Sequence, residues 1–266
     1  MSSTQPLLFS VAFRRKMAEL SQRERQEWLA SLAGQLRSTA GPAGKSVLRQ
    51  ELREVARGCR LSLVESIEKH LGPFDARYLT ALLEVPRERF VRPEDLERSA
   101  EDTPLPLDGE GLATISAPHA YLLSFRPLAL QPDDALVELG AGSGYGAALA
   151  AFVVGPQGSV VTFEIDETLA AWAARNVVSE TNVRIVRADA MSSAPQWGPA
   201  KKVVATFAVH ELPAAWVDAL PEGGKLVAPV GPHDRDQQLV LVTRRHGRVV
   251  ETEHGAVRYV KNRSGG

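Results

Sequence analysis

The alternation of strand-like and helix-like segments after Pro132 most constrains how this chain of 266 residues can fold. Short runs rich in β-branched residues recur there, and segments of helical length separate them. The expected strands are residues 135–140, 159–166, 182–189, 201–208 and 224–231, and the expected helices are residues 145–155, 167–180 and 212–220. This alternation predicts an α/β fold with a doubly wound, mostly parallel sheet. Two antiparallel edge strands, expected at residues 237–245 and 249–260, make it a seven-stranded sheet.

The N-terminal third has helical rather than strand-like patterns. The expected helices are residues 13–37, 46–70 and 75–84. A Gly- and Pro-containing break, STAGPAG at residues 38–44, separates the first two. We therefore expect a helical N-terminal extension, residues 1–62, ahead of a main domain, residues 63–266. Its charge-rich helices are typical of a solvated bundle that covers one face of the main domain, and docking of a partner is the alternative.

Composition excludes several classes of partner. The formal net charge is −1, so no basic excess indicates binding to nucleic acid or to an anionic membrane. No apolar run approaches the length of a membrane-spanning helix, and the N-terminus lacks the order of a secretory signal. Cys59 is the only cysteine, which excludes an internal disulfide and fits a reducing compartment. We expect a cytoplasmic protein.

A glycine-rich loop, VELGAGSGYG at residues 137–146, follows the first expected strand. Glycines at every second position let the backbone turn sharply and approach a ligand closely. The turn after the first strand of such a fold is where a nucleotide-like ligand binds, at the carboxyl edge of the sheet. The loop residues expected to contact the ligand are Gly140, Ala141, Gly142, Ser143, Gly144 and Tyr145. A tight turn that only packs helix against strand is the structural alternative.

Acidic residues at the ends of the next two strands favour the ligand. Glu164 lies 20 residues beyond Gly144, where a carboxylate can accept hydrogen bonds from both ribose hydroxyls. Asp189 ends the third strand, at the same edge, where it can meet an adenine amino group. The neighbouring Ile165 and Ala190 are included in this site. Asp166 is better explained as the cap of the following helix. Together these residues predict an adenosine site.

The spacing of the glycines decides between adenosine cofactors. A dinucleotide-binding loop prefers G-x-G-x-x-G, whereas this loop has G-x-G-x-G. Glu138 precedes the first of these glycines by two residues, where an acid can bind the ammonium group of an amino-acid tail. A pyrophosphate has no such group. The pattern resembles that of class I S-adenosylmethionine-dependent methyltransferases, and it predicts S-adenosyl-L-methionine as the cofactor.

Motifs on both sides of the loop narrow the resemblance. VPRERFV (residues 85–91), DTPLP (102–106) and ATISAPH (113–119) precede the loop, and ELPAAWVDALPEGGKLVAPVG (211–231) and AVRYV (256–260) follow it. In this order the chain resembles the protein-L-isoaspartate O-methyltransferases over about residues 63–260. The resemblance implies carboxyl methylation of L-isoaspartyl residues in peptides or proteins, which is a repair reaction. It also implies that Thr114, Ile115 and Ser116 hold the acceptor, with Ser116 against its carboxylate.

This chemistry needs neither a general base nor a metal ion, because the acceptor carboxylate is ionised at neutral pH. We accordingly expect no metal site and no Ser/His/Asp set. His119 follows the acceptor segment, where it either contributes to the site or forms a local hydrogen bond. The sequence leaves the oligomeric state open.

Several positions depart from the family pattern on the acceptor side. The loop PLPLDGEGLATIS has one extra residue, Ala100 and Lys201 replace a usual tyrosine and a usual aspartate, and Phe207 can narrow the pocket. One alternative is therefore a specialised relative that methylates an aspartate of a dedicated ribosomal peptide, with the N-terminal helices as its recognition element. A cofactor-binding protein of the same fold without activity is the second alternative.

Overall fold

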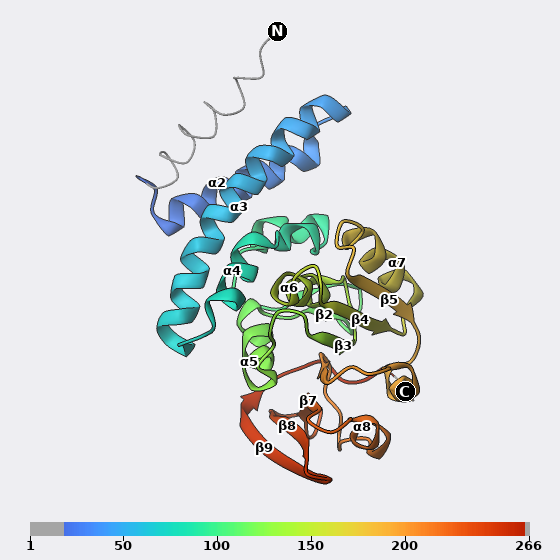
Figure 1. The fold of residues 1–266 in the computed structure, drawn as a ribbon. Helices are drawn as coiled ribbons and strands as arrows, with labels where there is room; N and C mark the ends of the chain where they lie inside the picture. The colour runs from blue at the N-terminus through green and yellow to red at the C-terminus, as the bar shows by residue number, and fades with distance from the viewer. Residues whose placement is uncertain (1–18, 264–266) are drawn as a thin grey trace.

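The computed structural model describes residues 19–263 and contains the expected seven-stranded sheet (Figure 1). The strand order is β5-β4-β3-β6-β7-β8-β9. The strands are β3 (Ala135–Leu139), β4 (Ser159–Glu164), β5 (Val183–Arg187), β6 (Lys202–Ala205), β7 (Lys225–Val230), β8 (Gln237–Arg245) and β9 (Arg248–Val257). The first five are parallel, and β8 and β9 extend the sheet antiparallel to β7. The doubly wound α/β fold class is confirmed.

Helices cover both faces of the sheet, because successive side chains of a strand point to opposite faces. In β3, Leu136 packs into one apolar core and the adjacent Val137 into another. The first core also contains side chains of α4 (Ala76–Glu84), α5 (Pro118–Leu128), α6 (Tyr145–Val154) and α7 (Glu167–Asn176). The second contains Trp216 of α8 (Ala214–Ala219). This two-sided burial explains why the central strands are almost entirely apolar.

The N-terminal extension forms two long helices, α2 (Gln22–Ser38) and α3 (Pro42–Leu71). The part of the first expected helix at residues 13–18 lies outside the described residues. Ser21 caps α2, and its side chain and that of Glu24 form a capping box. α3 begins four residues earlier than expected, because Pro42 suits the first position of a helix and the preceding Gly41 has a positive φ of 86°.

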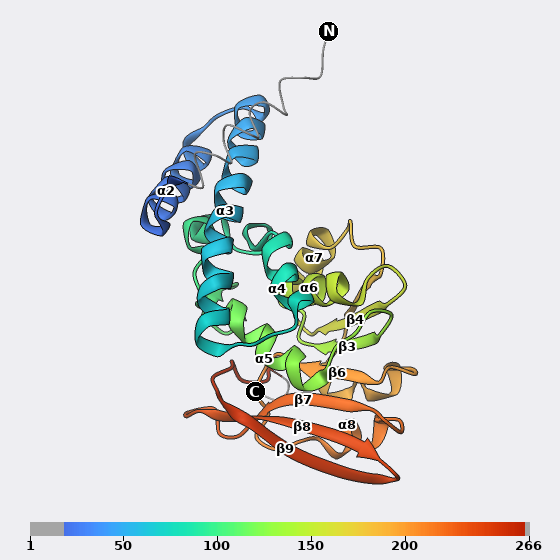
Figure 2. The ribbon, with the colours of Figure 1, turned by 60° about the vertical axis from the view of Figure 1, so that its left-hand side comes forward.

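The extension lies beside the main domain rather than across the sheet. A third, smaller apolar core joins Leu29 and Leu32 of α2 to Leu52 and Val55 of α3. The C-terminal half of α3 packs near α4, while α2 and the start of α3 project away from the sheet (Figure 2). α3 crosses residue 62 without interruption, so the division at residues 62 and 63 stays a prediction. No helix within residues 19–263 is long and apolar enough to cross a membrane.

The segment between α4 and α5 is ordered by short elements. It contains two 3₁₀ helices, η1 (Arg87–Arg89) and η2 (Pro93–Arg98), and a two-stranded hairpin of β1 (Leu105–Pro106) and β2 (Thr114–Ile115). The carboxylate of Asp108 closes the hairpin loop by accepting hydrogen bonds from the N–H groups of Leu112, at 3.0 Å, and Ala113, at 2.9 Å. We call residues 105–115 the acceptor hairpin, after the role that the resemblance implies for Thr114 and Ile115.

Candidate active site

One pocket lies at the carboxyl ends of β3, β4 and β6, beside the acceptor hairpin. It brings together most of the residues that the sequence singled out. These are Thr114, Ile115, Ser116, Glu138, Gly140, Ala141, Gly142, Ser143, Glu164, Ile165, Asp189 and Ala190. Parallel strands end at the same edge of a sheet, so residues distant in sequence meet there. Their roles in binding stay predictions.

Gly144 and Tyr145 lie behind the wall of this pocket. A Cβ on Gly144 would meet Val177 and Ala173, at 3.1 and 3.3 Å, so this glycine lets α6 approach α7. Tyr145 is fully buried, with its ring against the rings of Phe90 and Tyr121. In this structure both residues support the loop from within the core.

The glycine loop is fixed by its neighbours. Gly140 and Gly142 have positive φ angles of 97° and 54°, which favour glycine. A Cβ on Gly140 would lie 2.5 Å from Oγ1 of Thr206, so a side chain has no room. The N–H groups of Gly140 and Ala141 both donate to the carbonyl of Phe163, at 2.9 Å. These hydrogen bonds and close contacts within the chain therefore hold the loop in its shape.

Glu164 connects the loop to the end of β4. Its carboxylate accepts hydrogen bonds from the N–H of Gly142, at 2.8 Å, and of Asp166, at 3.0 Å. Burial raises the pKa of Glu164, and these two hydrogen bonds oppose that effect. Asp166 caps α7, as expected, by accepting from the N–H groups of Thr168 and Leu169. Glu164 therefore holds the glycine loop and Asp166 caps α7, although only one residue lies between these two acids.

Glu138 is a buried acid in the pocket wall. Within residues 19–263 its carboxyl group accepts one hydrogen bond, at 2.7 Å, from the hydroxyl of Thr162. Thr162 is the residue directly opposite on β4. Burial raises the pKa of Glu138 to about 8, while the Thr162 hydroxyl lowers it and the nearby Glu164 raises it further. No cation of the described residues pairs with it. A ligand ammonium group is the natural complement of such a carboxyl group.

Gly146 makes room for that carboxyl group. A Cβ at this position would overlap Oε1 of Glu138. Asp189, at the third strand end, accepts a hydrogen bond from the N–H of Met191, at 2.9 Å, and also lines the pocket. The acids of all three strand ends thus border one space, which fits the ammonium, ribose and adenine groups of S-adenosylmethionine.

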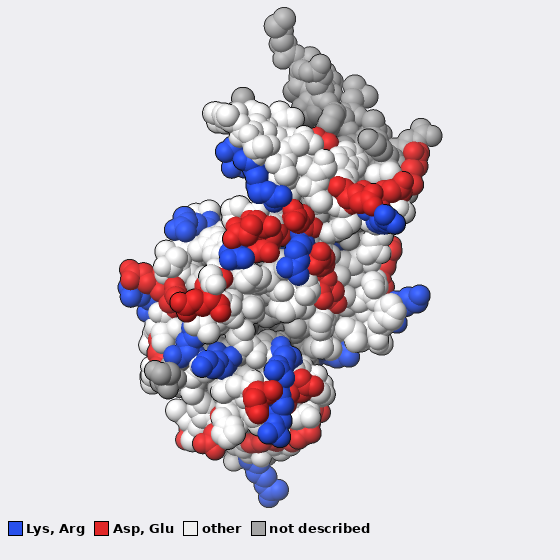
Figure 3. All heavy atoms as spheres, turned by 180° about the vertical axis from the view of Figure 1, so that it is seen from behind, with Lys and Arg blue, Asp and Glu red and all other residues white. Residues whose placement is uncertain are grey.

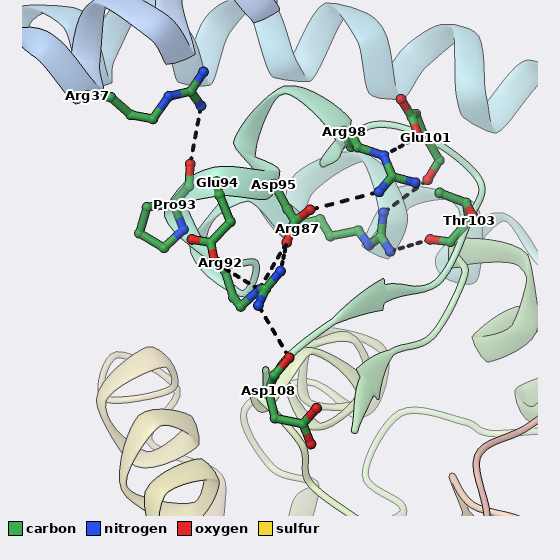
Figure 4. Close-up of polar contacts among 10 residues, drawn as sticks. All are labelled: Arg37, Arg87, Arg92, Pro93, Glu94, Asp95, Arg98, Glu101, Thr103 and Asp108. Carbon is green, nitrogen blue, oxygen red and sulfur yellow. Dashed lines mark hydrogen bonds and ion pairs between the residues drawn. The ribbon is translucent and has the colours of Figure 1, made fainter. Parts of the chain in front are cut away.

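Arg87 holds the acceptor segment from inside the core. Its guanidinium group is buried and donates to the backbone carbonyls of Ser99, Glu101, Thr103 and Ser116, at distances of 2.7 to 3.2 Å. Figure 4 shows two of these bonds, to Glu101 and Thr103. The N–H of Ser116 donates to the hydroxyl of Tyr121, at 3.3 Å. The position of Ser116 is therefore set by its backbone, and no side chain or backbone group of residues 19–263 is hydrogen-bonded to its hydroxyl.

His119 forms a local hydrogen bond, which was one of the two expectations. Its Nδ1 lies 2.9 Å from Oδ1 of Asp102, and its backbone N–H donates to the same oxygen. Burial of Asp102 opposes its ionisation, but the hydrogen bonds from His119 outweigh burial and lower the pKa of Asp102. His119 does not line the pocket. Within residues 19–263, no group of three His, Cys, Asp or Glu side chains is arranged to hold a metal ion.

Sequence reasoning missed the C-terminal wall of the pocket. Val260, Lys261, Asn262 and Arg263 line it together with Thr206 and Phe207. That Phe207 narrows the pocket stays a prediction. Arg263 binds Asp108 of the acceptor hairpin, at 2.6 Å, and Asp166 at the start of α7, at 3.2 Å. This side chain spans the mouth of the site from the acceptor side to the cofactor side. Motif AVRYV ends at Val260, so the three residues after it, 261–263, carried no signal in the sequence.

Comparison with known proteins agrees with this geometry. The family model described as protein-L-isoaspartate(D-aspartate) O-methyltransferase matches residues 61–265. Protein-L-isoaspartate O-methyltransferase of Methanoculleus marisnigri is 38% identical over 208 residues, which cover 76% of this chain and 91% of the relative. Protein-L-isoaspartate O-methyltransferase 2 of an Anaeromyxobacter species is 34% identical over 209 residues, which cover 78% and 84% of the two chains.

Solved structures give the same result. A protein-L-isoaspartate O-methyltransferase structure has a TM-score of 0.69 and 30% identity, covering 78% of this chain and 66% of that one. For the fold alone, a Plasmodium falciparum structure, titled as a putative enzyme of this kind in complex with S-adenosyl-L-homocysteine, has a TM-score of 0.66 and 24% identity. It covers 76% of this chain and 97% of that one. This chain belongs to the protein-L-isoaspartate (D-aspartate) O-methyltransferase family.

Proposed function

We propose that this chain methylates the side-chain carboxylate of L-isoaspartyl residues in peptides or proteins, with S-adenosyl-L-methionine as the methyl donor. The observation that carries the proposal is the shared pocket of Ser116 and the two acids Glu138 and Glu164. An acceptor group and a cofactor that bind on opposite walls of one pocket lie close enough to react. Membership of the family supports the same reaction.

The cofactor side is assigned to three acids. Glu138 pairs with the ammonium group of the methionine part, Glu164 accepts hydrogen bonds from the ribose hydroxyls, and Asp189 accepts from the adenine amino group. When bound, the cofactor supplies an electrophilic methyl group on a sulfonium centre. The glycine loop, held in shape by hydrogen bonds to Phe163 and Glu164, forms a rigid wall beside the cofactor.

The acceptor side is assigned to residues 114–116. Thr114 and Ile115 of β2 hold the peptide, and the hydroxyl of Ser116 donates a hydrogen bond to its carboxylate. The carboxylate is ionised at neutral pH, so its oxygen would need no general base to accept the methyl group that the cofactor would supply. The chain's own residues therefore orient the reactants and exclude water. Arg263 closes one side of the pocket by its two ion pairs.

A second candidate is methylation of an aspartate in one dedicated peptide. Two observations favour it: helix α2 lies outside the residues that the family model matches, and Phe207 lines the pocket. For either substrate we propose a cytoplasmic location, supported by the single buried Cys59. The net charge of −1 supports a peptide or protein rather than nucleic acid as the partner.

Methyl transfer to matched peptides tests both candidates. Purified protein is incubated with methyl-labelled cofactor and either an isoaspartyl peptide or its aspartyl twin. Label in the isoaspartyl peptide alone supports repair. Label in neither peptide, together with measurable S-adenosylhomocysteine binding, contradicts general repair. The dedicated-peptide candidate then requires turnover on a precursor peptide.

A further inference from the structure

A second hollow lies between the helical extension and the main domain. It is bordered by α2, α3 and residues 88–96, and we call it the basic groove. Lys45, Arg49 and Arg53 of α3 form its charged wall, and Val91 and Leu96 are among its apolar residues. Figure 3 shows Lys and Arg side chains gathered where the helical extension, at the top of the view, meets the main domain, with Asp and Glu side chains on the main domain below them.

Three cations of α3 line the groove, and one of them, Arg53, lies close enough to the buried Glu88 to oppose the rise of its pKa. Lys45, Arg49 and Arg53 are four residues apart and so lie on one side of the helix. Within residues 19–263 none of their side chains has a hydrogen-bond or ion-pair partner, whereas Arg57, the next residue in the series, pairs with Glu84. Like charges at this spacing destabilise a helix. A helix that keeps them without partners is suited to an anionic ligand.

Acidic side chains around the groove are already neutralised. Glu88, in the groove lining, is buried against Arg60, with Oε2 and Nη1 2.5 Å apart. Glu97 pairs with Arg37 at 3.0 Å, and Asp95 pairs with Arg92 at the same distance. The uncompensated charge of the groove is therefore positive, in a chain whose net charge is −1.

The groove is connected to the acceptor hairpin through a short polar chain (Figure 4). Arg37 of α2 donates to the carbonyl of Pro93, and Arg92 donates to the carbonyl of Asp108, at 3.4 and 3.3 Å. Asp108 in turn binds Arg263 at the pocket. A polypeptide in the groove would thus lie on the same segment that holds the acceptor hairpin.

We propose that the basic groove binds an acidic, leucine-containing segment of the polypeptide substrate, remote from the methylated residue. That the segment belongs to the substrate rests on the function proposed above. Cations select carboxylates, and apolar residues such as Val91 and Leu96 accept aliphatic side chains. Proteins that bind single-stranded nucleic acid use aromatic side chains on which the bases stack. Within residues 19–263, none of the residues that line the groove is aromatic. An acidic peptide therefore fits the groove better than nucleic acid does.

Binding of a model peptide tests the groove without any methylation. The probe is a fluorescein-labelled repeat of Glu-Glu-Leu, with a Gln-Gln-Leu repeat as its uncharged control, and fluorescence anisotropy gives the Kd. We expect the full chain to bind the Glu peptide and the variant K45Q/R49Q/R53Q to bind it at least about tenfold more weakly. The matched variant R184Q/R245Q/R248Q removes three exposed cations elsewhere and should leave the Kd unchanged. Circular dichroism verifies that both variants fold.

Three outcomes overturn the proposal. They are no binding of the Glu peptide by the full chain, equal weakening in both triple variants, and a groove-dependent affinity for oligothymidylate that exceeds that for the peptide. With an isoaspartyl peptide fused to the acidic repeat, K45Q/R49Q/R53Q should raise KM and leave kcat unchanged. Turnover of the short isoaspartyl peptide should not change. Peptide binding without any turnover by the full chain would contradict the proposed function and leave the groove assignment intact.

Discussion

Glu138 is the residue whose environment says most about the ligand. The residue is 2% exposed, and its carboxyl group has a pKa of about 8 and lines the pocket. The α-amino group of a peptide also has a pKa of about 8, and in a free amino acid the carboxylate on the same carbon raises this pKa further. When the two groups meet, the pair holds one proton. At acid pH the separate groups hold two protons and binding releases one, whereas at alkaline pH they hold none and binding takes one up.

Affinity for S-adenosylhomocysteine should therefore be greatest at or slightly above pH 8 and fall on both sides, because each limb adds or removes one proton. Isothermal titration calorimetry across pH 6 to 10 measures it, with Glu138→Gln as the variant. We expect the variant to bind about tenfold more weakly at pH 8, since it loses a charge-assisted hydrogen bond, and to lose the decline toward acid pH. A variant with the full acid limb would show that another group titrates.

Ser116 tests the acceptor side in the same pocket. Ser116→Ala removes one hydrogen bond to a charged group, so kcat for an isoaspartyl peptide should fall by about tenfold to a hundredfold. The Kd for S-adenosylhomocysteine should stay within about twofold, because the backbone of Ser116 is held by Arg87 and Tyr121 in the variant too. Ser179→Ala, in an exposed turn after α7, is the matched control. Loss of cofactor affinity with unchanged kcat would contradict this assignment.

At the scale of elements, Arg87 ties the η1–η2 segment to the start of α5. Arg87→Met leaves four carbonyl groups without their buried donor, so the acceptor hairpin should loosen. We expect a higher KM for peptide, little change in the Kd for S-adenosylhomocysteine, and a loss of about 2–4 kcal/mol in the free energy of unfolding. Steady-state kinetics and urea unfolding measure these changes.

Arg98→Met is the comparison for this variant, because Arg98 lies in the same segment but its side chain is 43% exposed and pairs with the carboxylates of Asp95 and Glu101 rather than with buried carbonyl groups. It should cost less than about 1 kcal/mol and leave KM unchanged. If the two variants behave alike, the buried carbonyl contacts of Arg87 do not position the acceptor segment.

At the scale of the whole molecule, one buried ion pair joins the extension to the main domain. Arg60 of α3 binds Glu88 of η1, and both side chains are 5% exposed. Arg60→Met leaves Glu88 buried without a cation and should cost about 3–5 kcal/mol of unfolding free energy. The double variant Arg60→Met/Glu88→Leu should recover most of this loss.

Urea unfolding of the two single variants, Arg60→Met and Glu88→Leu, and of the double variant measures the coupling between the two residues. Arg57→Met is the control, because its ion pair with Glu84 is 42% and 41% exposed, and it should cost less than about 1 kcal/mol. A double variant as unstable as the sum of its single variants would show that the pair does not act as a unit.

Some residues of the site could be predicted from the sequence, and others could not. Glu138, Glu164 and Asp189 were identifiable because each lies within two residues of the carboxyl end of a strand whose apolar pattern is local, and the topology of parallel strands brings them to one edge. Arg87 was visible only within a family motif. Its task depends on carbonyls up to 29 residues away, and no local pattern encodes such contacts.

The sequence by itself determined the sheet, the strand ends and the chemistry of the cofactor side, because side-chain periodicity and glycine spacing act over a few residues. Tertiary structure decided the rest. Arg263 reaches Asp108 across 155 residues, and α3 passes through the expected domain boundary to form the basic groove with residues 88–96. These contacts arise from packing between distant elements, whose geometry is fixed only when the whole chain has folded.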